Sequence, residues 1–175
     1  MLWSIGHSNR SLEEFTRLLH EQQIQLVIDV RKLRGSKRCP QFNAEALAGS
    51  LAAEGMSLHA IEALAGRRLV NHEVDFETNA WWQNRSFHNY ADHALGQDFA
   101  AGLGELAALA AEQRTAFMCS EAVWWRCHRR IITDWLLAQG HQVQHVLGPG
   151  QVQPASLSAG AVVRQETVRY PKPAS

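Results

Sequence analysis

Short apolar runs alternate along the chain with amphipathic stretches. The apolar runs predict strands at residues 2–5, 25–30, 56–61, 114–120 and 141–147. The amphipathic stretches predict helices at residues 12–22, 43–54, 87–95, 98–112 and 125–139. Strands that alternate with helices are typical of βαβ units, which build a parallel sheet covered on both faces. We therefore predict a three-layer, Rossmann-like α/β domain over residues 1–147, with a mainly parallel sheet flanked by helices.

Two segments carry no sustained hydrophobic period. Residues 62–85 are irregular in pattern, and a stretch of this length inside a compact domain is more often functional or irregular than a plain connection. Residues 148–175 are rich in Pro, Gln, Ala and Ser and predict an extended C-terminal tail.

Composition adds little to this picture. Hydrophobic residues make up 46% and charged residues 19% of the 175, which is the ordinary globular range, and 17 basic residues balance 17 acidic ones. The N-terminus does not resemble a signal peptide, and no apolar stretch approaches the ~18 residues of a membrane span. Three cysteines at irregular spacing fit a reducing compartment better than a disulfide framework. We expect a soluble, cytoplasmic protein whose net charge indicates no partner.

Polar residues follow three of the predicted strands directly. In open α/β sheets, ligands bind beyond the carboxyl ends of the strands. The residues at the three strand ends are 6–9 (Gly-His-Ser-Asn), 29–31 (Asp-Val-Arg) and 119–121 (Cys-Ser-Glu). We therefore expect the site, if there is one, at this edge of the sheet.

Cys119 falls at a strand end just before a predicted helix, where backbone N–H groups and the helix dipole favour a thiolate. The segment is similar to the C-x5-R loop of cysteine phosphatases and to rhodanese loops, but Arg126 lies seven residues after Cys119, one too many. Cys119 is therefore a candidate nucleophile. The alternative is a small apolar residue buried at a strand end.

Cys127 and His128 follow in the same segment. The C-x7-C-H spacing lacks the short ligand pairs of zinc sites, so we expect no metal, and we expect no other cofactor. On a helix over residues 125–139, Cys127 would share the core face with Ile131, and Arg126 and Arg129 would lie nearer the opposite side.

Three further groups are candidates for acid or base chemistry. Asp29 and Arg31 project to the same face of a strand and could pair; Asp29 is either a base or a local hydrogen-bond anchor. His7 has a suitable reference pKa, but it could equally satisfy backbone groups in a turn. Glu121 is either a general acid or base or a complement to the helix N-terminus.

Ten cations gather in three patches near the strand ends, and six aromatic residues are interleaved with them. Guanidinium groups match phosphate oxygens, and aromatic rings stack on bases, so a phosphate-bearing ligand or nucleic acid is the natural partner. The alternative is a solvated basic loop with tryptophans in the core. The cations are Arg31, Lys32, Arg34, Lys37, Arg38, Arg67, Arg68, Arg126, Arg129 and Arg130, and the aromatics are Trp81, Trp82, Phe87, Tyr90, Trp124 and Trp125.

Several ordered motifs together resemble the DUF488 family, over about residues 3–147. They are GHS at 6–8, DVR at 29–31, P-x-F-N at 40–43, LAGR at 64–67 and M-C-x-E with C-H-R at 118–129. The resemblance implies an α/β fold and a shared site, but no reaction. The family pattern has glycine where this chain has Ala65, and alanine would change the geometry if that position needs a positive φ.

We expect a polar, anion-binding site that acts on a nucleotide or nucleic acid. Cys119, Glu121, Asp29 and His7 are its candidate catalytic residues. Its candidate binding residues are Ser8, Arg31, Arg67, Arg126, His128 and Arg129. One alternative is a non-catalytic nucleic-acid-binding module with Trp81, Trp82 and Trp124 as stacking platforms; another is a thiol-dependent sulfur or redox protein using Cys119. The sequence leaves the oligomeric state open.

Overall fold

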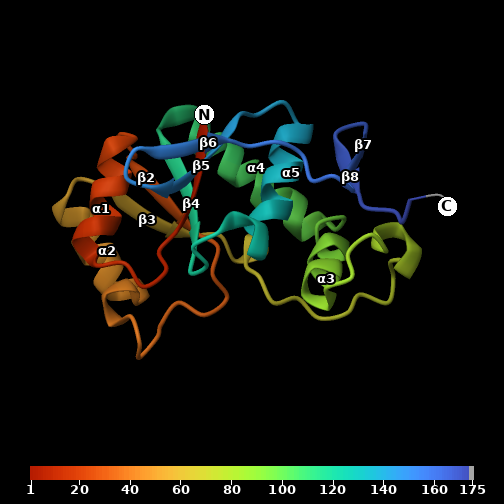
Figure 1. Ribbon diagram of the computed structural model, residues 1–175, viewed down its shortest axis with the longest axis horizontal. Coiled ribbons are helices and arrows are strands. Elements are labelled where there is room, and N and C mark those ends of the chain that lie inside the picture. The colour runs from red at the N-terminus through yellow and green to blue at the C-terminus, as the bar shows by residue number, and fades with distance from the viewer. Residues whose placement is uncertain (174–175) are drawn as a thin grey trace.

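A computed structural model describes residues 1–173 and shows a central sheet of six strands in the order β3-β2-β4-β1-β5-β6 (Figure 1). Strands β1 to β5 are parallel, and β6 runs antiparallel to β5 at one edge. The strands are β1 (Leu2–Gly6), β2 (Leu26–Asp29), β3 (Ser57–Ala60), β4 (Thr115–Cys119), β5 (Val143–Gly148) and β6 (Gln151–Pro154).

Helices cover both faces of the sheet, which confirms the predicted three-layer α/β fold. Helices α1 (Leu12–Glu21) and α2 (Ala44–Ala53) pack on one face, and α3 (Arg85–His93), α4 (Gln97–Glu112) and α5 (Arg129–Ala138) lie on the other (Figure 1). Alternate residues of β1 serve the two cores, Leu2 on the α4–α5 side and Trp3 on the α1–α2 side. Helix α1 begins where its sequence predicts, because the Ser11 hydroxyl accepts a hydrogen bond from the Glu14 N–H at 3.1 Å.

The last helix begins later than its hydrophobic pattern predicts. Residues 120–128 form a loop with a short 3-10 turn, η4 (Trp124–Arg126), and Cys127 is extended, with φ −142° and ψ 161°. Helix α5 therefore starts at Arg129. The expectation that Cys127 and Arg126 lie on helical faces is wrong, because both precede the helix.

Three further 3-10 turns interrupt the long connections. They are η1 (Pro40–Phe42), η2 (Glu62–Leu64) and η3 (Phe76–Asn79). The last two lie in the segment 62–85 whose irregular pattern predicted no long element. Within the described residues, no helix is long and apolar enough to cross a membrane.

An extended tail was expected over residues 148–175, of which 174–175 lie outside the described residues. Residues 148–173 instead include short strands that pack on the domain. This segment contributes β6 and a hairpin of β7 (Val162–Arg164) and β8 (Thr167–Arg169). Tyr170 is buried, and its hydroxyl donates to the Asp134 carboxylate of α5 at 2.7 Å. These strands have three or four residues and mostly exposed side chains, so they carry too little hydrophobic alternation to be predicted.

Candidate functional site

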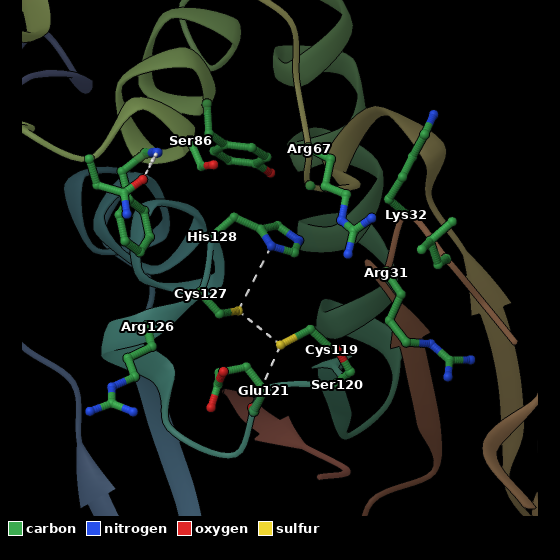
Figure 2. A pocket seen from close by; sticks show the side chains of 15 residues that line it. Arg31, Lys32, Arg67, Ser86, Cys119, Ser120, Glu121, Arg126, Cys127 and His128 are labelled. Carbon is green, nitrogen blue, oxygen red and sulfur yellow. Dashed lines mark hydrogen bonds between the residues drawn. The ribbon is translucent and has the colours of Figure 1, made fainter. Parts of the chain in front are cut away.

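Two adjoining cavities lie over the carboxyl edge of the sheet. Their volumes are about 300 and 520 Å³. The sheet order places β4 between β1 and β2, so the three polar strand ends meet there. The two cavities share the residues Arg31, Leu33, Arg67, Ser120 and Glu121. Figure 2 shows the residues that line the smaller cavity.

Asp29 and Arg31 form a buried ion pair. The Asp29 carboxylate accepts hydrogen bonds from the Arg31 backbone N–H at 3.0 Å and from its Nε and Nη2 at 3.0 and 2.8 Å. Arg31 Nη1 donates to the Phe42 carbonyl at 2.7 Å. Asp29 lines neither cavity, so its arrangement is that of an anchor that fixes Arg31 at the cavity wall.

His7 lies beside this pair, stacked on Phe42 with ring centroids 4.4 Å apart. Its Nδ1 lies 2.8 Å from the Ser8 carbonyl, and its Nε2 lies 3.3 Å from Arg31 Nη1. These contacts fix the tautomer, because the ring must donate to the carbonyl and accept from the guanidinium. Burial lowers the pKa of His7, which keeps the ring neutral.

The end of β1 lies very close to the loop that follows β4. A Cβ on Gly6 would lie 1.8 Å from the Glu121 carbonyl oxygen, so a side chain cannot fit there. The Ser8 N–H donates to the Ser120 carbonyl at 3.0 Å, and Ser8 adopts a φ of 51°. Ser8 and His7 line the larger cavity. The GHS motif thus holds the Ser120–Glu121 loop in position.

Cys119 and Cys127 contact each other beneath the smaller cavity. Their sulfur atoms are 2.8 Å apart, and both residues are buried (Figure 2). Burial and the neighbouring Cys127 raise the pKa of Cys119 well above its usual range. Burial alone would also raise the pKa of Cys127. Its effect is outweighed by hydrogen bonds from Cys119 and Arg129 and by the positive charge of Arg129, which together lower the pKa of Cys127 to about 7.

Arg129 is fully buried behind these thiols. Its Nε donates to Cys119 Sγ at 3.0 Å, its Nη1 to Ser4 Oγ at 2.7 Å, and its Nη2 to the Glu121 carbonyl at 2.5 Å. It lines neither cavity. Arg129 was expected to bind substrate; the structure places its guanidinium against Cys119, Ser4 and Glu121 and outside the lining of both cavities.

His128 closes the site on the side of α3. Its Nε2 lies 2.7 Å from the Val30 carbonyl, and its ring packs 5.0 Å from that of Tyr90. A Cβ on Gly66 would lie 2.8 Å from Nδ1, which explains the glycine of the LAGR motif. The neighbouring Ala65 has an ordinary φ of −64°, so alanine fits where the family pattern has glycine. Burial lowers the pKa of His128.

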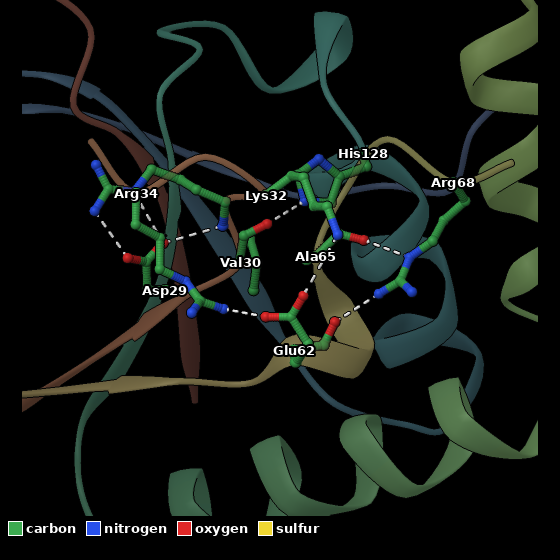
Figure 3. A network of polar contacts seen from close by, with 9 residues as sticks. Asp29, Val30, Lys32, Arg34, Glu62, Ala65, Arg68 and His128 are labelled. Carbon is green, nitrogen blue, oxygen red and sulfur yellow. Dashed lines mark hydrogen bonds and ion pairs between the residues drawn. The ribbon is translucent and has the colours of Figure 1, made fainter. Parts of the chain in front are cut away.

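Most of the predicted cations have partners within the protein. Lys32 and Arg34 pair with Glu62 at 3.8 and 2.5 Å, and Arg68 donates to the carbonyls of Glu62 and Ala65 (Figure 3). Arg130 packs over the ring of Trp82 at 5.0 Å.

Arg67 and Arg126 differ from these cations. Both are exposed and line the smaller cavity, and within residues 1–173 neither guanidinium has a hydrogen-bond or ion-pair partner. Arg67 adopts a left-handed φ of 58°. Glu121 also lines both cavities without a partner for its carboxylate in the same part of the chain.

The tryptophans expected as stacking platforms are engaged in packing. Trp82 is buried against Phe87, with ring centroids 4.9 Å apart. Trp124 stacks on His145 at 4.4 Å, and Trp81 packs against Tyr170 at 6.3 Å. These faces are therefore not open to bases, and Phe87 and Tyr90 are the aromatic residues that line the smaller cavity.

The fold and the cavities define an α/β protein with a polar site at the carboxyl edge of a mainly parallel sheet. The family described as "Domain of unknown function DUF488" matches residues 11–136, and the chain belongs to this family. No curated protein and no solved structure matches the chain. Family membership confirms the resemblance seen in the motifs and supplies no reaction.

Sequence reasoning missed the contact between Cys127 and Cys119, because Cys127 was expected to be an ordinary core residue of a helix. It also missed Ser4, an inward-facing residue of β1 that binds Arg129. The sequence did offer one signal: a second cysteine, Cys119, lies eight residues before Cys127, on the other side of a strand-to-helix junction. Contact between the two sulfurs depends on the loop geometry, which hydrophobic periodicity does not encode.

Proposed function

We propose that the protein binds a small phosphate-bearing ligand, of the nucleotide class, in the smaller cavity. The observation that carries the proposal is the pair of unpartnered guanidinium groups, Arg67 and Arg126, on opposite sides of that cavity (Figure 2). Guanidinium forks match phosphate oxygens in geometry and charge. Two guanidinium groups that line one cavity and have no acidic partner within residues 1–173 are free to bind the same anion.

The remaining lining suits such a ligand. The volume of about 300 Å³ is at the lower end of the range for small-molecule sites, which favours a mononucleotide over a larger ligand. Ser86 and Ser120, which carry hydroxyl groups, line this cavity together with the aromatic residue Phe87. The stacking surfaces that an oligonucleotide would need are largely covered, so a small ligand is favoured over a nucleic-acid strand.

Glu121 is the candidate for proton transfer in this proposal. Its carboxylate borders both cavities, whereas Asp29 is held by Arg31 and His7 is neutral with both ring nitrogens engaged. If the site is catalytic, Glu121→Gln should abolish turnover while ligand binding is retained.

A thermal-shift titration with inorganic phosphate, mononucleotides and short oligonucleotides tests the proposal. We expect a mononucleotide to raise the melting temperature of the wild type. Removal of one guanidinium, in Arg67→Ala or Arg126→Ala, should weaken the apparent Kd by about 10- to 100-fold, because a hydrogen bond to a charged group contributes roughly 1.5–3 kcal/mol.

Arg17→Ala is the matched control, since Arg17 is an exposed arginine of α1 that lines neither cavity. It should bind as the wild type does. A shift that survives in both cavity variants, or no shift with any of the anions, would overturn the proposal. A shift with oligonucleotides alone that falls steeply with salt would instead support the non-catalytic nucleic-acid module.

A further inference from the structure

The two thiols and the arginine behind them form a second chemical unit, which anion binding does not use. We propose that Cys119 and Cys127 are a redox-active dithiol, in which Cys127 attacks a low-molecular-weight disulfide that enters the smaller cavity and Cys119 completes an internal disulfide. The proposal depends on the Cys119–Cys127–Arg129 geometry and is independent of the phosphate ligand proposed above.

The charge of Arg129 is the first argument. A guanidinium stays protonated in proteins, and a buried charge is costly unless an opposite charge compensates it. Within residues 1–173, Arg129 has no carboxylate partner: Glu121 approaches with its carbonyl oxygen, and the Ser4 hydroxyl is neutral. The groups in contact that can carry a negative charge are the two thiols, so one of them compensates Arg129 as a thiolate.

Arg129 donates to both sulfur atoms, from its Nε to Cys119 Sγ at 3.0 Å and from its backbone N–H to Cys127 Sγ at 3.2 Å. Cys127 Sγ lies 2.8 Å from Cys119 Sγ, close enough to accept its S–H, and the lowered pKa of Cys127 favours this residue as the thiolate. Cys119 retains its proton because burial and the adjacent thiolate both favour its neutral form. A thiolate beside a thiol is the arrangement that thiol–disulfide exchange requires, one as the nucleophile and the other as the resolving group.

The exposure of the two cysteines agrees with these roles. Both residues line the smaller cavity, and Cys127 is 8% exposed whereas Cys119 is 3% exposed. The residue assigned as the nucleophile is thus the more exposed of the two. A volume of about 300 Å³ admits a small disulfide but not a folded protein.

The exchange balances in two steps. The Cys127 thiolate attacks one sulfur of the disulfide R–S–S–R; a Cys127–S–S–R bond forms, the R–S–S–R bond breaks, and the first RS⁻ leaves with a negative charge. Cys119 then loses its proton and attacks Cys127 Sγ, which forms the Cys119–Cys127 disulfide and releases the second RS⁻. One RS⁻ takes up the Cys119 proton. The dithiol is oxidised by two electrons, and the small disulfide is reduced to one thiol and one thiolate.

Arg129 also sets the direction of this equilibrium. It stabilises the thiolate and therefore the reduced pair, and a stabilised reduced form makes the disulfide a strong oxidant. The internal disulfide should consequently require an excess of the oxidised small molecule. In the reverse direction it should be reduced readily by a small thiol.

The test uses wild-type protein in glutathione buffers that range from fully reduced to fully oxidised. After an acid quench, free thiols are alkylated and the protein is mapped by mass spectrometry. We expect the Cys119–Cys127 disulfide to appear in oxidised glutathione while Cys39, a buried free thiol, remains alkylatable after unfolding. Wild-type protein in which no such disulfide forms, even in fully oxidised glutathione, would overturn the proposal.

Two conservative variants in a Cys39→Ser background assign the roles. Cys119→Ser should accumulate a Cys127–glutathione adduct, because the resolving thiol is gone. Cys127→Ser should form an adduct at Cys119 at least tenfold more slowly. Equal rates would refute the assigned roles. Thiol chemistry is measured here without phosphate ligand, and anion binding is measured without oxidant, so the failure of one proposal leaves the other standing.

Discussion

The charge of Arg129 should control the ionisation of Cys127. Arg129→Met removes the guanidinium and keeps a side chain of similar length, so the thiolate loses its compensating charge. The pKa of Cys127 is about 7, against an ordinary value of 9.0. Without Arg129 we expect it to return to at least that ordinary value. At pH 7 the thiolate fraction would fall from one half to about 1%, a change of roughly 50-fold.

The assay is the pH dependence of iodoacetamide labelling at Cys127 in a Cys39→Ser background. The midpoint of the profile is the readout. A thiolate whose pKa is two units higher reacts roughly tenfold faster, and this would mask part of the change in rate at any single pH. The titratable groups facing Cys127 are Cys119 of β4, Tyr90 of α3 and the adjoining His128 and Arg129. Of these, Arg129 supplies the positive charge that lowers its pKa.

Arg129→Lys is the control, because lysine keeps the positive charge but lacks the several N–H donors of the planar guanidinium group. Its midpoint should remain below that of Arg129→Met. A midpoint near pH 7 in Arg129→Met would refute the reasoning, because the thiolate would then be stabilised without the arginine. The same result would remove the electrostatic argument for a thiolate beneath the cavity.

Two predictions concern stability. Asp29→Asn leaves the Arg31 charge buried without a partner, so it should lower the free energy of unfolding, measured in urea, by about 3–5 kcal/mol. Glu62→Gln removes an exposed pair and should lower the free energy of unfolding by less than about 1 kcal/mol. Similar losses in the two variants would contradict the buried-pair argument. Burial and Arg129 lower the pKa of His145 to about 3, so below pH 6.5 the unfolded chain binds a proton that the folded chain does not. The free energy of unfolding should therefore fall by about 2 kcal/mol between pH 6.5 and 4.5, and His145→Gln should lose that part of the decline.

Hydrophobic periodicity was enough to predict the layers of the fold. The apolar runs at 25–30 and 114–120 are buried on both faces, so they form β2 and β4 in the middle of a parallel sheet as their patterns predict. Strand β6 and the β7–β8 hairpin escaped prediction because their few exposed residues are held by pairing and by the Tyr170–Asp134 contact. Such contacts join residues distant in sequence and leave no local period.

The site was predictable in position but only partly in detail. The strand-end rule brought residues 6–9, 29–31 and 119–121 to one edge, and the shared face of Asp29 and Arg31 indicated that they could pair. The sequence did not distinguish cations with internal partners from those without, because that depends on where carboxylates such as Glu62 lie in space. Nor did it show that Arg129 faces inward, which follows from a helix start four residues later than its pattern predicts.

Arg67 holds its backbone in a conformation that most residues with a side chain avoid. Its φ of 58° follows Gly66, whose α-carbon must lie against the His128 ring. Glycine would adopt this φ without strain, so stability alone would favour glycine at position 67. Under the proposed function, this strain is tolerated for the sake of the Arg67 guanidinium. The proposal then implies that thermodynamic stability and ligand binding are opposed at this position, and that a search for stabilising substitutions would tend to remove the binding group first.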